Sequence, residues 1–231
     1  MKKAFILLFI FSSCVSAYAQ KKKKGNDKQK VPISTDYTSD DTFPDSLTKF
    51  TGIIKYRMTS NDPADKDSMF IIFGENQIRV TMFMPGYREN EIFENNFIAD
   101  FRDSSITLLD VRNKTYRYEL FSSRNQGVEF ALSNFKKTGQ IIQIPCNEYS
   151  GEMKTSDGQE FQVAALVSKK HSYMNAKDYY FLNIQPVIMG YKIVLAYRTK
   201  SAENESSFIV AYQIIPGETS SYFDLSDYKQ K

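Results

Sequence analysis

Cys146 and His171 are the side chains of this sequence that could supply a nucleophile and its general base. The chain has one histidine and two cysteines, and an imidazole beside a thiol is a common way to activate a nucleophile. Cys146 falls within an expected strand, whereas His171 follows two lysines in an expected loop. A cysteine buried in a strand is usually inert, so we expect no catalytic dyad and no enzymatic activity.

Two groups of carboxylates offer acid–base or metal chemistry. Three glutamates lie in the segment 89–94, and three aspartates lie in the segment 62–67. A glycosidase needs two carboxyl groups at a fixed separation in space, which spacing along a loop does not define. The aspartate segment lacks the glycine and the terminal glutamate of a calcium-binding hand. We therefore expect solvated surface turns, with no catalytic residue, no metal and no cofactor.

The composition is typical of one globular domain with a tail. The chain has 231 residues, of which 42% are hydrophobic and 14% aromatic, too many for a disordered protein and too few for one with several membrane spans. Residues 1–30 hold 8 of the 30 basic residues and one of the 27 acidic residues, so the remainder has a net charge of −4. A slightly acidic domain is a poor nucleic-acid binder, and we expect no nucleic-acid partner.

Residues 1–19 have the pattern of an export signal. Lys2 and Lys3 precede an apolar run, and Ala17-Tyr18-Ala19 provides the small residues that a signal peptidase requires. We expect cleavage between Ala19 and Gln20 and a periplasmic protein. In an alternative interpretation, the segment 11–14 is a lipobox, and Cys14 is lipidated and anchored to the outer membrane.

Residues 20–46 are expected to form a flexible linker, rich in lysine first and then in serine, threonine, aspartate and proline. The lysine run is Lys21, Lys22, Lys23 and Lys24. These charges would attract an anionic membrane surface, or they simply form a solvated, extended segment.

From residue 47 onward, apolar and polar residues alternate with a period of two, which predicts strands with one buried face. Gly74-Glu75-Asn76 and Ser156-Asp157-Gly158-Gln159 are turn sequences between such segments and predict hairpins. The segment 127–135 has the spacing of a short helix, with a strand as the alternative, and 176–183 could be a helical turn or a loop. We predict a mainly β fold, a curved antiparallel sheet with one or two short covering helices.

Several phrases of residues 47–229 resemble exported Bacteroidota proteins of unknown function with a domain similar to the outer-membrane lipoprotein carrier LolA. The phrases are Phe50-x-Gly52, Ile106-Thr107-Leu108-Leu109-Asp110, Lys114-Thr115-Tyr116, Lys137-Thr138-Gly139, Ile144-Pro145-Cys146-Asn147-Glu148-Tyr149 and Phe223-Asp224-Leu225-Ser226-Asp227-Tyr228-Lys229. The resemblance implies a half-barrel whose apolar concave face is suited to holding acyl chains.

We therefore expect a non-enzymatic protein of the cell envelope that binds a hydrophobic or lipid-bearing ligand. Methionine and aromatic side chains adapt to varied apolar ligands. The expected lining residues are Phe50, Tyr56, Met82, Met84, Tyr116, Tyr118, Tyr197 and Tyr212. In the alternative, these side chains fill an ordinary core, and the chain is a structural module of the envelope that docks a protein partner through its curved sheet.

Overall fold

The structure is a computed structural model that describes residues 48–60, 68–85, 92–121, 128–155, 158–173, 192–201 and 206–231. The expected export signal at 1–19, the linker at 20–46 and the segment 176–183 lie outside the described residues. No helix in the described part of the chain has the length and apolar character that crossing a membrane requires.

The described residues form strands almost throughout, and the mainly β prediction is confirmed. The strands are β1 (Thr48–Lys49), β2 (Gly52–Ser60), β3 (Ser68–Phe73), β4 (Gln77–Pro85), β5 (Ile92–Asp100), β6 (Ser105–Asp110), β7 (Thr115–Leu120), β8 (Val128–Ile141), β9 (Ile144–Thr155), β10 (Glu160–Ser172), β11 (Lys192–Ser201), β12 (Ser206–Pro216) and β13 (Lys229–Gln230).

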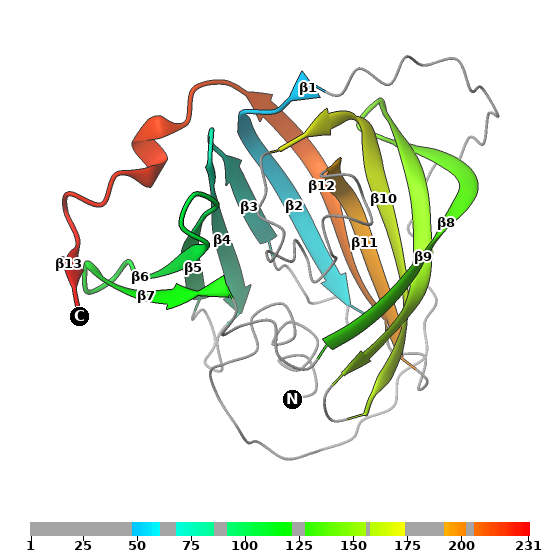
Figure 1. The fold of residues 1–231 in the computed structure, drawn as a ribbon, viewed down its shortest axis with the longest axis horizontal. Coiled ribbons are helices and arrows are strands. Elements are labelled where there is room, and N and C mark those ends of the chain that lie inside the picture. Colours follow the sequence, from blue (N-terminus) through cyan, green and yellow to red (C-terminus); the bar gives the residue numbers. More distant parts are fainter. Residues whose placement is uncertain are drawn as a thin grey trace.

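All of these strands belong to one curved sheet. Its order is β13-β7-β6-β5-β4-β3-β2-β12-β11-β10-β9-β8, with β1 added beside β10. The pairs are antiparallel except β1 with β10 and β13 with β7, which are parallel. Figure 1 shows the sheet bending around β2 and β12, so that β4 to β7 form one wall and β8 to β11 the other.

The period of two in the sequence separates the two faces of this sheet. In β2, Ile54, Tyr56 and Met58 are buried in the core, whereas Lys55 is half-buried and Arg57 is exposed on the opposite side. We call the face that carries Tyr56 the inner face and the face that carries Arg57 the outer face. Side chains of the inner face from both walls pack into one hydrophobic core.

The helical spacing at 127–135 does not produce a helix. Its described residues, 128–135, are part of β8, whose backbone pairs with β9 from Val128 opposite Thr155 to Asn134 opposite Tyr149. Eleven of the fourteen residues of β8 have partners in β9, which satisfies more backbone groups than one isolated helical turn would, and the strand alternative is the one found. A short 3-10 turn, η3 (Ser220–Phe223), follows β12.

The segment after β12 crosses the outer face and covers an edge of the sheet. The Thr219 hydroxyl donates to the backbone oxygen of Phe73 at 3.0 Å, and the Arg79 guanidinium donates to the backbone oxygen of Tyr222 at 2.8 Å. β13 then pairs with β7 and forms this end of the sheet. A covered edge strand is less able to pair with another chain.

Candidate functional site

A row of fully buried side chains crosses the inner face of β2, β3 and β4. Tyr56 lies opposite Met69, and Met69 lies opposite Met82. Each of the three has 0% of its surface exposed. Tyr56 and Met82, two of the predicted lining residues, are therefore brought to the same face and level of the sheet.

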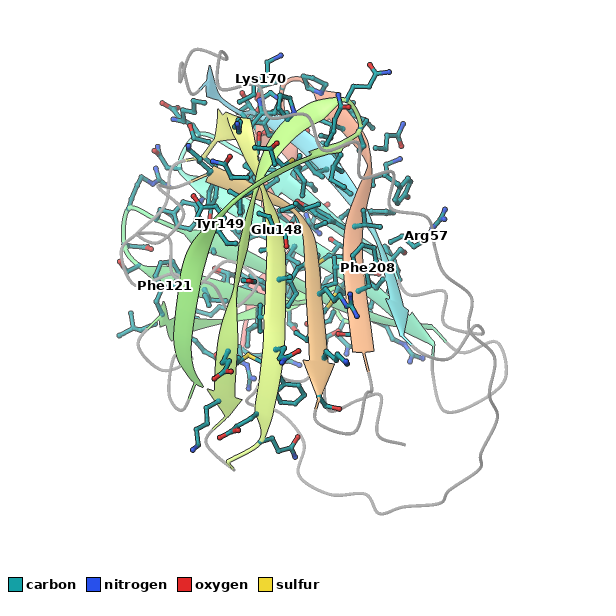
Figure 2. The ribbon with its side chains drawn as sticks, turned by 90° about the vertical axis from the view of Figure 1, so that its right-hand side faces the viewer. Arg57, Phe121, Glu148, Tyr149, Lys170 and Phe208 are labelled. Carbon is teal, nitrogen blue, oxygen red and sulfur yellow. The ribbon has the colours of Figure 1, made fainter. Side chains whose placement is uncertain are left out.

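A second row continues the inner face on the other wall. The register places Tyr197 between Ala165 and Ile209, and it places Ile209 opposite Met58 and Ala165 opposite Tyr149. All five side chains are buried. Figure 2 labels Tyr149 on β9, on the wall that faces the viewer. The inner face is thus largely apolar across both walls, with phenylalanine, methionine and tyrosine among its large side chains.

Tyr56 joins the two walls by a hydrogen bond. Its hydroxyl donates to the backbone oxygen of Val194 in β11 at 2.9 Å. A register shift between Leu166 and Val167 of β10 interrupts the pairing with β11 at this level. Burial raises the pKa of Tyr56 far above its ordinary value, so this hydroxyl stays protonated and acts as a donor.

Phe50 belongs to an aromatic cluster at the end of the sheet where β2 begins and β10 ends. Its ring meets Phe73 at 5.5 Å, Phe73 meets Tyr173 at 5.6 Å, and Tyr173 meets Phe101 at 6.1 Å. Phe121 extends the cluster beside Phe101 at 6.2 Å. Aromatic pairs, here edge-to-face or tilted, stabilise packing beyond the area they bury, and they connect the ends of β3, β5 and β7 to the end of β10.

Tyr116 and Tyr118 do not lie with the other predicted lining residues. The register places Tyr116 opposite Leu109 and Tyr118 opposite Thr107, on the outer face. Their rings contact each other at 5.4 Å, and Tyr118 is 54% exposed. The alternation in the sequence places both tyrosines on one face, but the lengths of the preceding turns decide which face that is.

Tyr212 also lies outside the inner face. The pairing of β12 with β2 shifts between Ala211 and Gln213, so Tyr212 is the extra residue of a bulge. The Arg57 guanidinium packs over its ring at 5.5 Å, and 44% of Tyr212 is exposed. Figure 2 shows Arg57 at the side of β2 and β12, where Phe208 also lies. Met84 is within β4, but its side chain is outside the described residues.

On β11 and β12, the inner face carries hydroxyl side chains toward their hairpin, a feature that the sequence reasoning missed. Thr199 and Ser201 follow Tyr197 at intervals of two residues, so they share its face. The hydroxyls of Thr199 and Ser207 are hydrogen-bonded at 2.7 Å. The buried hydroxyl oxygens of Tyr197 and Ser201 have no hydrogen-bond partner in the part of the chain that the structure describes. In the sequence, Tyr197, Thr199 and Ser201 alternate with Ala196, Arg198 and Lys200. This alternation is the signal that could have shown that the three hydroxyl residues share one face.

Cys146 and His171 lie in surroundings that oppose catalysis. Burial raises the pKa of Cys146 to about 12, and its thiol donates to the backbone oxygen of Ile144 at 3.3 Å. Burial lowers the pKa of His171, whose ring packs against Phe50 at 5.2 Å. A protonated buried thiol is a poor nucleophile, so this thiol is not activated.

The carboxylate groups behave as surface residues where the structure describes them. Glu94 is exposed, and its carboxylate accepts a hydrogen bond from Asn96 at 2.9 Å. Residues 62–67 and the glutamates at 89 and 91 lie outside the described residues. Among the residues that the structure does describe, no cluster of three or more His, Cys, Asp or Glu side chains could hold a metal ion.

The fold is therefore an open, curved, antiparallel β-sheet with an apolar inner face. No protein-family model and no curated protein matches the chain. Among solved structures it is similar to PNGF-II, determined in space groups C2 and P21, with TM-scores of 0.47 and 0.45 and sequence identities of 9% and 10%. The similarity covers 79% of this chain but 31% and 32% of those chains, so this chain spans about a third of their length. At these TM-scores and identities, the similarity carries no conclusion about function.

Proposed function

We propose that this chain is a non-enzymatic cell-envelope protein that holds an acyl chain, free or attached to a partner, against the inner face of its sheet. The supporting observation is the inner face itself, which is apolar from Leu108 on one wall to Met153 on the other. The sheet is not closed, because β8 and β13 lie at opposite ends of the strand order. An open sheet with an apolar concave face can enclose a chain-like ligand between its walls.

The methionines favour a flexible apolar ligand. Met69 and Met82 lie in one row of the inner face and Met58 in the next, and Met153 of β9 belongs to the same core. The unbranched thioether adapts its conformation at low cost, which suits acyl chains of varied length and shape. The location in the envelope rests on the export pattern of residues 1–19, and the resemblance to LolA-like proteins points to the same class of ligand.

Mass spectrometry of organic extracts tests this proposal. The protein is purified without detergent from its own cell envelope, and an unrelated exported protein is treated in the same way. We expect about one acyl-chain molecule per protein chain, and we expect none in the extract of the unrelated protein. An extract without such a species would contradict the proposal.

A pair of glutamine variants tests whether the acyl chain occupies the inner face. Met82→Gln places a polar amide in the fully buried row, whereas Tyr118→Gln places the same amide on the exposed outer face. We expect Met82→Gln to retain several-fold less acyl chain and Tyr118→Gln to retain the normal amount, with far-UV circular dichroism checking the fold of both. Equal loss from the two variants would place the ligand elsewhere.

A protein-docking module is the second candidate, and the outer face of β7 favours it. Tyr118 and Leu120 are 54% and 61% exposed on the same side of this strand. Exposed apolar side chains that adjoin one another often mark an interaction surface. If the extracts are empty, photo-crosslinking from position 118 in the cell envelope becomes the measurement that separates a docking module from a protein with neither role.

A further inference from the structure

We propose that the Tyr197 hydroxyl binds the carbonyl oxygen of an acyl ester, and that the polar end of the inner face near Ser201 accommodates the ester's head group. This inference rests on the proposed acyl-chain binding and adds the ligand's chemical class and its orientation between the walls. It starts from a hydroxyl that the apolar core leaves without a partner.

Tyr197 is 4% exposed and sits among apolar side chains of the inner face. Its neighbours across the sheet are Ala165 and Ile209, both buried. Its hydroxyl oxygen is buried and has no hydrogen-bond partner among the described residues. Buried hydroxyls are nearly always hydrogen-bonded, because leaving one unpaired costs about 1–3 kcal/mol. A ligand that supplies an acceptor would remove this cost.

Tyr56 provides the comparison within the same face. It is also buried, but its hydroxyl donates to the backbone oxygen of Val194 at 2.9 Å. The core therefore gives the Tyr56 hydroxyl an acceptor and leaves the Tyr197 hydroxyl without a partner among the described residues. Burial raises the pKa of Tyr197 above its ordinary value, so its hydroxyl remains a proton donor.

The chemistry of the neighbours favours a neutral acceptor. Val163 and Phe161, which precede Ala165 on the inner face of β10, are buried and apolar, and Thr199 is already bonded to Ser207. An ionised carboxylate enclosed by such groups would carry a large desolvation penalty, whereas an ester carbonyl accepts one hydrogen bond without a counter-ion.

The polar residues also set the direction of the ligand. Thr199, Ser201 and Ser207 lie on the side of Tyr197 toward the β11–β12 hairpin, and the aromatic cluster around Phe73 closes the opposite end. Ser201 lies four residues beyond Tyr197, roughly 13 Å along the strand. The acyl chain would run from Tyr197 toward Tyr56 and the aromatic cluster, and the head group would lie near Ser201.

Two probes of similar length, methyl dodecanoate and tridecane, test the inference. Each displaces the apolar fluorophore N-phenyl-1-naphthylamine from the full chain and from Tyr197→Phe, with Tyr212→Phe as the control that removes an exposed hydroxyl. We expect Tyr197→Phe to bind methyl dodecanoate about five- to tenfold more weakly than the parent and to bind tridecane with the same affinity. We expect Tyr212→Phe to bind both probes as the parent does.

The outcomes separate this inference from the proposed function. If neither probe binds the parent chain, both fail. If both probes bind the parent, but Tyr197→Phe keeps its affinity for both or loses affinity for both equally, acyl-chain binding stands and the role of Tyr197 is overturned. Infrared spectra of the bound ester, labelled with ¹³C at its carbonyl, give a second readout. We expect the carbonyl band of the parent complex at the lower wavenumber of a hydrogen-bonded carbonyl. In Tyr197→Phe, we expect the band at the wavenumber of a carbonyl without a hydrogen bond. An identical band in the two proteins would overturn the assignment.

Discussion

Two buried tyrosines of the inner face differ in whether their hydroxyls are paired, and this difference predicts different effects of the same substitution. Tyr56→Phe removes a hydrogen bond and leaves the backbone oxygen of Val194 without it. We expect a loss of about 1–2 kcal/mol in the free energy of unfolding. Tyr197→Phe removes a hydroxyl without a partner in the described residues, and we expect no loss or a small gain in the ligand-free protein.

Urea unfolding followed by far-UV circular dichroism measures both tyrosine variants. Equal destabilisation by the two substitutions would show that the Tyr197 hydroxyl has a partner in the free protein.

The carboxyl group of Asp100 should make the stability of the fold depend on pH. Its burial raises the carboxyl pKa, but hydrogen bonds from Arg102 and Gln77 outweigh that effect and hold the pKa below 3.8. A carboxyl whose folded pKa is lowered stabilises the fold above its unfolded pKa, and this stability is lost as the pH falls through the folded value. We expect Asp100→Asn to cost about 1–2 kcal/mol at pH 7 and the difference from the parent to shrink below about pH 4.

The measurement is urea unfolding of Asp100→Asn at pH 7 and at pH 3. The exposed Asp227→Asn serves as the control and should change stability by less than about 0.5 kcal/mol. A difference for Asp100→Asn that stays constant over this pH range would contradict the assigned sign.

At the scale of elements, the start of β2 depends on a glycine. Gly52 has a φ of +145°, and a Cβ there would lie 2.3 Å from the backbone oxygen of Ile215. Gly217 has a similar φ of +156°, but a Cβ there would meet nothing within 4 Å. We expect Gly52→Ala to cost about 3 kcal/mol or more and Gly217→Ala about 1 kcal/mol, because the second variant carries the backbone strain without the clash.

Thermal unfolding of the two alanine variants checks this expectation. A similar loss in both would mean that strain at positive φ, and not the close packing of β2 against β12, accounts for the effect.

The pairing of β13 with β7 predicts how the edge of the sheet behaves. The Lys229 amide donates to the backbone oxygen of Lys114 and the Lys231 amide to that of Tyr116, both at 2.9 Å. Deleting residues 226–231 would expose an edge strand that already presents Tyr118 and Leu120. We expect concentration-dependent association of the truncated chain in sedimentation velocity.

Lys231→Ala is the matched control for the truncation. It removes only an ion pair with Asp110 at 3.3 Å, in which the lysine side chain is 60% exposed, and such pairs contribute little. This variant should sediment as the parent does. Unchanged sedimentation of the truncated chain would show that β13 does not protect the edge.

For the whole molecule, one continuous sheet and one core predict a single cooperative transition. The inner-face side chains of both walls belong to the same hydrophobic cluster. A ligand that binds only the folded state raises its stability by about 2.7 kcal/mol at a concentration of 100 times Kd. We therefore expect methyl dodecanoate to raise the Tm of this one transition, followed by far-UV circular dichroism and tyrosine fluorescence. Two separate transitions, with only one of them shifted, would show that the walls unfold independently.

Much of the fold was predictable because strand alternation is a local property. The hairpin around Gly74-Glu75-Asn76 is found where the turn sequence places it, between β3 and β4. The segment 127–135 could not be settled in the same way, because its apolar spacing fits a helical turn and its strand is stabilised by pairing with residues 149–155. Of the predicted lining residues, Tyr56, Met82, Phe50 and Tyr197 are buried in the common core, whereas Tyr116, Tyr118 and Tyr212 are on the outer face.

The sequence by itself determined which residues alternate, where the main turns occur and that the chain forms an apolar β-sheet. It did so because side-chain polarity and turn chemistry act over a few neighbouring residues. The tertiary structure alone decided which face is inner, through the cross-strand register and the bulge at Tyr212. It also decided that the Tyr56 hydroxyl meets Val194, 138 residues away, while the Tyr197 hydroxyl meets no acceptor in the described chain. Such pairings depend on strands that are distant in sequence and adjacent in space.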